Sequence, residues 1–415
     1  MLLSVESIVD TALSEKNDDW EVENDLRNPV IDSSEFAYRA TNLVQIQDEG
    51  VKLAAKHIHQ RMLVESYTPR TWRTHPLHIC PSEPYDSADP LNTTVLNWIF
   101  LISSLNFSFW SEKAGQPECY GVNWRTSWTS RQTEVHTGYW ALVAALDRAL
   151  DEEIPITDAN FYSSETLCPD SLIQHVFREA DQCDESIPLF EDRVSIMREN
   201  GFILCNSFGG SFKGFVDEFH RRFSGQGTAL DLVKMVTDTF PLFRDEIFYE
   251  GRKVAIWKRA QILVAEIWAA FYPASPDVPH PIFPGLKGPE IHRLTMFADY
   301  RVPQILHHLR IISYPQSLLD LLHSGSPLAS GSREEVSLRC SSIIAVEHVK
   351  EEILRLVDEE GGDSAAALKS GTVCSVLIDF YLWDLAKKIE LGEEKVDGID
   401  TAQLVPVHRT RSIWY

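Results

Sequence analysis

The sequence lacks the cysteine pattern of a disulfide-stabilised protein. Its seven cysteines include no CxxC pair, and their number is odd. Free thiols are usual in the reducing compartments of a cell, whereas secreted proteins pair their cysteines. The first ten residues also lack the basic start and long apolar run of a secretory signal. We therefore expect free thiols and a protein of the cytosol or nucleus.

Long apolar runs and an excess of basic residues are missing as well. The most apolar stretch, 95–110, is too short to cross a bilayer and is interrupted by Asn and Ser residues. The 38 Lys and Arg are outnumbered by 61 Asp and Glu, which gives a formal net charge of -23. Because binding along a nucleic acid draws on clustered Lys and Arg, we expect no stable nucleic-acid binding and no membrane insertion. A local basic pocket for one phosphate remains compatible with this composition.

General catalytic and cofactor motifs are also absent. The sequence holds no GxGxxG after a strand, no GxxxxGK[ST], no HExxH and no GxSxG. The pairs His57/His59 and His307/His308 have no cysteine or carboxylate neighbours of the kind that a zinc site needs. We expect neither a metal nor an organic cofactor.

What the sequence does contain is typical of a large helical core. Of its 415 residues 44% are hydrophobic, and 11 Trp and 20 Phe indicate aromatic packing or ring-lined pockets. Apolar residues recur at helical spacing, whereas few segments alternate as strands do. We expect a mainly α protein with a small β ribbon at 120–129 or 247–257. The predicted helices span 40–66, 91–105, 138–150, 188–205, 229–240, 254–272, 301–312, 333–358 and 375–390.

The composition of successive segments also predicts how the chain is divided into domains. Residues 1–40 begin with an acidic stretch typical of a peripheral arm, and 41–415 form one domain because no segment clearly separates two cores. Three segments are predicted to be solvent loops. These are the proline-rich 272–290, the Ser- and Gly-rich 324–332 and the polar 359–371.

One segment that could carry chemistry runs from Thr295 to Gln304. It places Asp299 between Phe297 and Tyr300, just ahead of a helix that begins near Pro303. An Asp at this position often caps the helix and does nothing else. Alternatively, the helix dipole and the neighbouring Arg301 keep the carboxylate ionised while it faces a ligand cavity.

A second segment, 378–384, places two carboxylates beside an indole. On a helix Asp379 and Trp383 share a face, and Asp384 lies one step around. Buried carboxylates need partners, and a flat heterocycle with N–H donors would supply them while stacking on the indole. Salt bridges and a core Trp would explain the same residues. Taken alone, neither segment decides a function.

Several longer strings resemble those of the queuosine salvage family. They stand in the right order and extend from about Trp72 to Tyr415. The strings are 106–112, 138–140, 145–152, 154–157, 243–245, 257–265, 297–304 and 407–411.

This resemblance implies a fold similar to helix-hairpin-helix DNA glycosylases, although the glycine-rich hairpin of that fold is not visible here. It also implies hydrolysis of the N-glycosidic bond of queuosine 5'-monophosphate, with release of queuine for salvage into tRNA modification. By position, Asp299 corresponds to the catalytic carboxylate and Phe297 to a ring that contacts the base. The queuine site would be lined by Asp379, Trp383 and Asp384 and contacted by His78 or its neighbour His75. Tyr300 is a further predicted substrate-binding residue, and Lys258, Arg259 and Arg301 are candidate donors to the 5'-phosphate.

Two other functions remain open from the sequence. A non-catalytic helical module that binds tRNA or a protein partner would share the aromatic content, but it would need a basic face. A nucleosidase or DNA glycosylase that acts on another base would share the acidic site.

Overall fold

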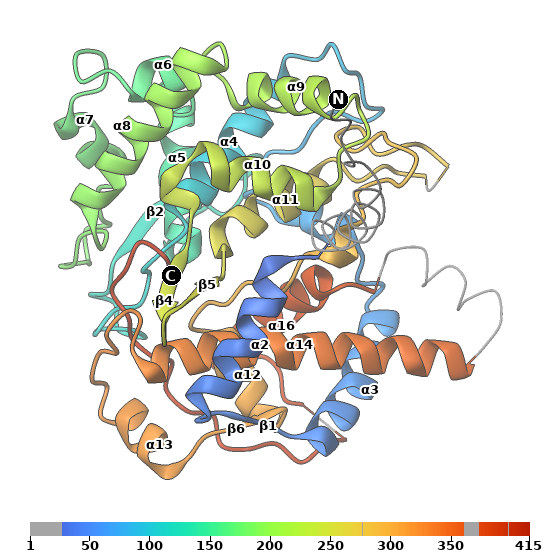
Figure 1. The fold of residues 1–415 in the computed structure, drawn as a ribbon. Coiled ribbons are helices and arrows are strands. Elements are labelled where there is room, and N and C mark those ends of the chain that lie inside the picture. Colours follow the sequence, from blue (N-terminus) through green and yellow to red (C-terminus); the bar gives the residue numbers. More distant parts are fainter. Residues whose placement is uncertain (1–26, 276, 361–372, 397) are drawn as a thin grey trace, which may run out of the picture.

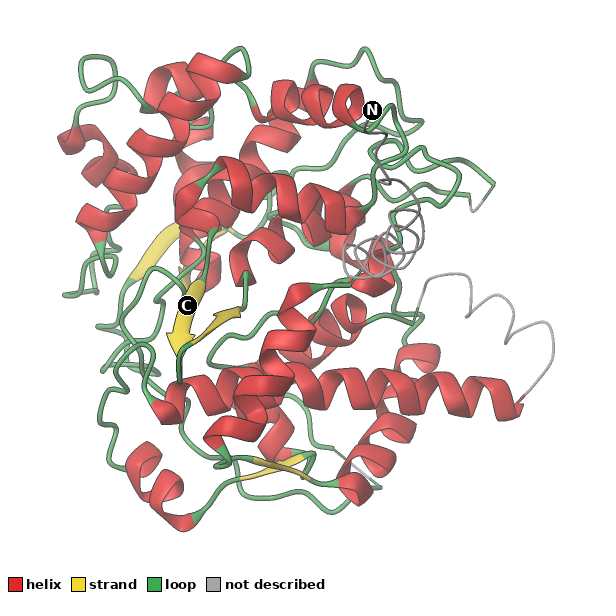
Figure 2. Ribbon diagram, viewed as in Figure 1, coloured by secondary structure: helices red, strands yellow, loops and turns green. Residues whose placement is uncertain are grey.

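The computed structural model describes residues 27–415 with the exception of 276, 361–372 and 397. Helices make up most of the described chain, and the strands are short and form three antiparallel pairs (Figure 2). The predicted mainly α class is confirmed. Strands are found at both predicted ribbon segments. The segment 120–129 contains β2 (Gly121–Arg125), whose partner β3 (Thr133–Thr137) lies beyond it, and the segment 247–257 contains most of the pair formed by β4 (Glu246–Tyr249) and β5 (Arg252–Ala255).

The middle of the chain forms one half of the molecule, the upper half in Figure 1. Helices α4 and α10 both pack against α11, a helix whose residues are all buried. The helices of this half are α4 (Leu91–Leu105), α5 (Tyr139–Asp151), α6 (Ala159–Tyr162), α7 (Asp170–Val176), α8 (Phe190–Ser207), α9 (Phe212–Arg222), α10 (Ala229–Thr239) and α11 (Lys258–Ala270).

The two ends of the described chain build the other half. Helices α2 and α3 pack on the long α14, and α12 packs on α16 (Figure 1). This half contains α2 (Pro29–Thr41), α3 (Asp48–Val64), α12 (Val302–His308), α13 (Gln316–His323), α14 (Arg333–Glu360), α16 (Ser375–Glu390) and the pair β1 (Gln45–Ile46) with β6 (Ile312–Ser313). Short 3₁₀ turns are η1 (Pro69–Thr74), η2 (Pro241–Phe243) and η3 (Ile291–Arg293).

Most predicted helices are confirmed, and the differences have local causes. The helix predicted at 40–66 is split, because Asn42 takes a left-handed conformation with φ of 41° and ends α2. The helix predicted at 301–312 ends at His308, and Arg310 has φ of 57° before strand β6. Apolar spacing cannot reveal such turns, since they depend on backbone angles that few residue types signal.

The predicted arm covers residues 1–40, and its last part belongs to the folded body. Residues 29–40 lie in α2, where Val30 and Ala37 are fully buried against the core. Asn28 caps this helix by accepting a hydrogen bond from the Val30 N–H, 3.0 Å long. Residues 1–26 lie outside the described part of the chain.

The proline-rich segment 272–290 is not a solvent loop throughout. Its described residues, all but 276, form no regular helix or strand, as predicted, but His280, Ile282 and Phe283 are buried. The His280 Nε2 lies 3.0 Å from the Trp268 carbonyl oxygen, and the Phe283 ring packs edge-on to Phe219. These side chains anchor the segment because burying them removes apolar surface from water. The loop predicted at 324–332 is confirmed, whereas 361–371 lies outside the described residues.

All seven cysteines are free, in agreement with the sequence. No helix in the described part of the chain is both long and apolar enough to cross a membrane.

A buried ion pair connects the two halves. The Arg339 guanidinium on α14 binds both oxygens of Asp245, at 3.1 and 2.6 Å, and neither side chain is more than 2% exposed. The same guanidinium donates to the carbonyl oxygen of Ala298, at 3.2 Å. The backbone oxygen of Asp245 in turn accepts from the N–H groups of Ile256 and Trp257. Arg339 thus fixes residue 298 relative to the beginning of α11.

We predict that Asp245→Ala lowers the free energy of unfolding by about 3–5 kcal/mol, because it leaves the Arg339 charge buried with too few partners. Urea unfolding followed by circular dichroism measures this loss. As a control, Glu218→Ala removes a solvent-exposed partner of Arg221 and should leave the unfolding midpoint unchanged. Equal effects of the two substitutions would contradict the prediction.

Candidate active site

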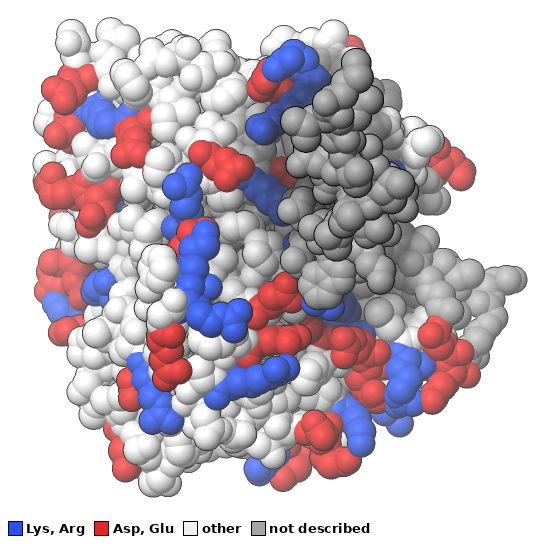
Figure 3. All heavy atoms as spheres, in the orientation of Figure 1, with Lys and Arg blue, Asp and Glu red and all other residues white. Residues whose placement is uncertain are grey.

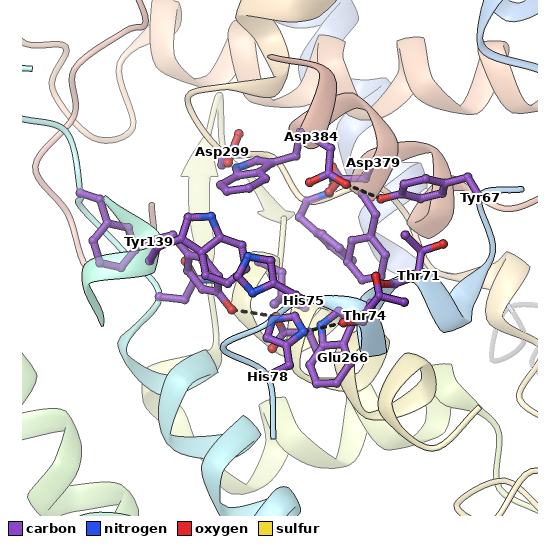
Figure 4. A pocket seen from close by; sticks show the side chains of 18 of the residues that line it. Tyr67, Thr71, Thr74, His75, His78, Tyr139, Glu266, Asp299, Asp379 and Asp384 are labelled. Carbon is purple, nitrogen blue, oxygen red and sulfur yellow. Dashed lines mark hydrogen bonds between the residues drawn. The ribbon is translucent and has the colours of Figure 1, made fainter. Parts of the chain in front are cut away.

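A cavity of about 390 Å³ lies where the two halves of the molecule meet. Its walls come from η1, the start of α5, one face of α11, the segment 297–300 and one face of α16 (Figure 4). It is lined by Tyr67, Thr68, Thr71, Trp72, Thr74, His75, Pro76, His78, Asn106, Phe109, Tyr139, Trp140, Lys258, Ile262, Glu266, Phe297, Asp299, Tyr300, Asp379, Phe380, Trp383 and Asp384.

Helical spacing explains which side chains of α11 and α16 reach the cavity. On α11, Lys258, Ile262 and Glu266 follow one another at intervals of four and lie on one face. On α16, Asp379 and Trp383 form one such pair and Phe380 and Asp384 another. The two carboxylates and the indole predicted from the sequence therefore do share a cavity.

Asp299 lines the cavity and also caps α12. Its Oδ1 accepts hydrogen bonds from the backbone N–H groups of Arg301 and Val302, at 2.8 and 2.9 Å. These two bonds orient the carboxylate, because N–H donors at the start of a helix hold its oxygen in a fixed position. The two interpretations of Asp299 from the sequence are thus compatible, since one oxygen caps the helix and the side chain still faces the cavity.

Asp379 lies close to Asp299, and its environment disfavours a second charge. Burial raises the pKa of the Asp379 carboxyl well above its usual value, and the negative charge of Asp299 raises it further. A hydrogen bond of 3.0 Å from the Phe297 N–H and the nearby Lys258 act in the opposite direction. A second negative charge on Asp379, next to Asp299, is therefore unfavourable.

Lys258 is the buried cation of the cavity. It is only 4% exposed, and its Nζ donates to the Asn106 carbonyl oxygen at 3.3 Å. Burial lowers the pKa of its ammonium group to about 8, although the charge of Asp299 opposes that shift. Lys258 is therefore positioned to balance Asp299 or an anionic ligand.

Asp384 is held by a tyrosine. The Tyr67 hydroxyl donates to Asp384 Oδ2 at 2.7 Å, and Figure 4 shows this bond at the edge of the acidic group. Burial raises the pKa of Asp384, while the hydrogen bond from Tyr67 lowers it. The centroid of the Trp383 ring lies 6.1 Å from those of the Tyr139 and Trp140 rings, in edge-to-face contact. These three rings line the same cavity as the carboxylates.

Both histidine candidates line the cavity, and each is stacked on a tryptophan. The His75 ring lies parallel to Trp140 at 3.6 Å, and the His78 ring lies on Trp72 at 3.9 Å. Burial lowers the pKa of His75 to about 4 and that of His78 to about 3. The two rings are therefore neutral at physiological pH.

The candidate phosphate donors from the sequence differ in their positions. Lys258 lines the cavity, whereas Arg301 and Arg259 do not. The Arg301 guanidinium pairs with Glu390 at 2.7 Å. The Arg259 guanidinium donates to the carbonyl oxygens of Ser104 and Leu242 in the core.

Several lining residues were not singled out from the sequence. Tyr67 and Glu266 are the most notable, because both carry polar groups toward the cavity. For Glu266 a signal existed: it stands eight residues after Lys258 and so falls on the same face of the helix. Within the described residues, no group of three His, Cys, Asp or Glu is arranged to hold a metal ion.

Comparison with known proteins places this cavity in a family. A family model described as queuosine salvage protein matches residues 86–415. The chain belongs to this family. The match includes every lining residue of α11 and α16 and the segment 297–300.

Curated relatives extend the similarity over nearly the whole chain. A protein of Schizosaccharomyces pombe is 35% identical over 388 residues, which cover 93% of this chain and 99% of the relative. A protein of Mus musculus is 35% identical over 391 residues, 92% of this chain and 98% of the relative. A protein of Bos taurus is 34% identical over 388 residues. Each is named queuosine 5'-phosphate N-glycosylase/hydrolase.

The raised pKa of Asp379 leads to a prediction about stability. In the unfolded chain an Asp ionises near pH 3.9, whereas in the folded protein Asp379 stays neutral to higher pH. Raising the pH above about 4 therefore favours unfolding through this group. Asp379→Asn removes this titration and keeps an oxygen for the Phe297 N–H. We expect the variant to gain stability over the wild type as the pH rises from about 4 to 8.

Urea unfolding of both proteins across that pH range tests this prediction. A difference in unfolding free energy that does not change with pH would show that Asp379 is ionised in the folded state.

Proposed function

We propose that this protein hydrolyses the N-glycosidic bond of queuosine 5'-monophosphate and releases queuine for salvage into tRNA modification. The observation that carries the proposal is Asp299, a carboxylate held by two backbone N–H groups inside an aromatic, acidic cavity. Membership of the queuosine salvage family supports it, as do the names of its curated relatives. In this proposal the chain is an N-glycosylase that acts on a small molecule.

The chemistry assigns Asp299 the central role. When the bond between ribose C1' and the base nitrogen breaks, the electron pair leaves with the base and positive charge develops on the sugar ring. Water then supplies the hydroxyl group that bonds to C1' and the proton that the departing base gains. A carboxylate fixed beside C1' stabilises the developing charge, and such a charge contributes about a hundredfold or more in rate. Its two backbone donors hold Asp299 in place, so little reorganisation is needed during the reaction.

The remaining cavity fits the leaving base. Queuine is a 7-deazaguanine that carries an amine on its side chain, so it offers N–H donors, a cation and a flat ring. Asp379 and Asp384 are acceptors for the donors and the cation. Phe297, Tyr300 and Trp383 supply ring surfaces, and the neutral His78 adds a further polar contact.

Lys258 is the candidate donor to the 5'-phosphate, because it alone of the three basic residues considered lines the cavity. Because burial disfavours the charged form of Lys258, an anion beside it would stabilise the ammonium group. The ion pair of Arg301 with Glu390 makes it a support for α12 in this proposal, and Arg259 supports the core.

The proposal includes a fold similar to helix-hairpin-helix DNA glycosylases and activity in the cytosol or nucleus. It assigns a nucleotide to the cavity and no role to nucleic-acid binding. On the face drawn in Figure 3, acidic and basic side chains are intermixed, in keeping with this choice. A non-catalytic module that binds tRNA or a protein is the alternative.

Base release from three compounds tests the proposal: queuosine 5'-monophosphate, the unphosphorylated nucleoside and GMP. We expect the wild type to release queuine from the first compound, and we expect Asp299→Asn to lose at least a hundredfold in kcat while remaining folded. Chromatography of the products measures both.

Release from GMP instead would indicate a nucleosidase of another specificity. If no base is released from any of the three, the binding module replaces the enzyme. Circular dichroism of Asp299→Asn serves as the control for folding, because its Asn oxygen can still accept the bonds from residues 301 and 302.

A further inference from the structure

Glu266 is a cavity carboxyl group for which the reaction described above has no use. It lies on α11 with 7% of its surface exposed. The Tyr139 hydroxyl donates to its Oε1 at 3.1 Å, and the Ser103 hydroxyl donates to its Oε2 at 3.3 Å. All of these partners are neutral, and no ion pair involves Glu266 among the residues that the structure describes. A buried carboxyl group without a cation is costly unless something else satisfies its oxygens.

A ring nitrogen of His78 in this part of the cavity has no hydrogen-bond partner among the described residues. The His78 Nδ1 lies 2.6 Å from the Trp72 carbonyl oxygen, which can only accept, so Nδ1 carries the proton. Because the ring is neutral, its Nε2 is a bare acceptor. This Nε2 is buried and has no hydrogen-bond partner within the described part of the chain. Trp72 stacks on His78 and also forms a hydrogen bond to Glu266, so the two acceptors are near neighbours.

We infer that Glu266 and His78 form an acceptor subsite for the N–H edge of a guanine-type base. That edge presents a ring N–H next to an exocyclic amino group, and each Glu266 oxygen has a further lone pair for such a donor. The His78 Nε2 accepts the remaining amino hydrogen. This inference rests on the proposed function and adds a specificity-determining residue, Glu266, to it.

The subsite lies across the cavity from Asp299, as a base between the two would require. Figure 4 shows Asp299, Asp379 and Asp384 on one side of the cavity and Glu266 with His78 on the opposite side. Along α11, Lys258 and Glu266 are eight residues apart, or about 12 Å at 1.5 Å per residue. That span suits a two-ring base with its ribose bond at the Asp299 end and hydrogen bonds at the far end.

The electrostatics agree with the geometry. Burial raises the pKa of Glu266 to about 7, although hydrogen bonds from Tyr139, Ser103 and Trp72 lower it. A base edge that donates to the carboxylate would favour its charged form. A ligand without that edge would leave the remaining lone pairs of the Glu266 oxygens and the His78 Nε2 without donors, and buried polar groups that lose a partner discriminate strongly between ligands.

The test compares queuosine 5'-monophosphate with the analogue that lacks the exocyclic 2-amino group. For the wild type we expect kcat/KM to be about 10- to 100-fold lower with the analogue. For Glu266→Gln we expect kcat/KM on queuosine 5'-monophosphate to fall by about 10- to 100-fold. The ratio of kcat/KM for this substrate to kcat/KM for the analogue should then shrink to about two. A purely structural role of Glu266 would lower both activities and leave their ratio unchanged.

Two further variants keep the test decisive. Glu347→Gln replaces a buried carboxylate outside the cavity that also accepts from a serine, Ser375, and it should retain the wild-type ratio. Tyr139→Phe removes one donor to Glu266, so its ratio should lie between those of the wild type and Glu266→Gln. This variant replaces Glu266→Gln in the test if the latter does not fold.

An unchanged ratio in Glu266→Gln, or in Tyr139→Phe where the former fails to fold, would overturn the inference. Loss of the ratio in Asp379→Asn but not in Glu266→Gln would also overturn it, since the edge would then bind Asp379. Absence of queuine release by the wild type would instead refute the proposed function, so the two failures are distinguishable.

Discussion

The ion pair between Arg339 and Asp245 is the contact on which the geometry of the cavity depends. The guanidinium is fully enclosed and holds the backbone at Ala298, directly before Asp299. Asp245 receives both guanidinium bonds and, through its backbone oxygen, holds the residues that precede Lys258. The ion pair thereby positions the carboxylate of Asp299 and the ammonium group of Lys258, which come from different halves of the molecule, around one cavity. Since the pair is buried, small movements would leave charge unsatisfied, which makes the arrangement rigid.

Desolvation is the second constraint, and it links the fold to its chemistry. The cavity brings Asp379, Asp384 and Glu266 out of water, and burial raises the pKa of each. In the free protein these groups are held by hydrogen bonds from neutral donors such as Tyr67 and Tyr139. A ligand rich in N–H groups and positive charge would supply donors to these carboxyl groups, so its binding would offset the desolvation cost of burying them. Asp299, fixed by backbone donors, is the carboxylate that the proposed function assigns to the bond that breaks.

Much of the architecture could be read from apolar spacing. The helices α4, α5, α10, α14 and α16 begin and end within a few residues of the predicted limits, because each has a continuous apolar face or a clear start signal. The break at Asn42 and the packing of 280–283 onto the core could not be predicted in this way. Both depend on a backbone angle or a distant partner, which local sequence does not encode.

The sequence by itself determined the family and the chemically unusual segments around Asp299 and Asp379, because those strings are long and specific. Only the tertiary structure decided which side chains share a cavity. It brought Tyr67 to Asp384 across 317 residues of chain, removed Arg259 and Arg301 from the cavity lining, and placed Glu266 beside His78. The reason is physical: whether a polar side chain binds a ligand or supports the core depends on the partners and burial that folding provides, and these are properties of packing between distant segments.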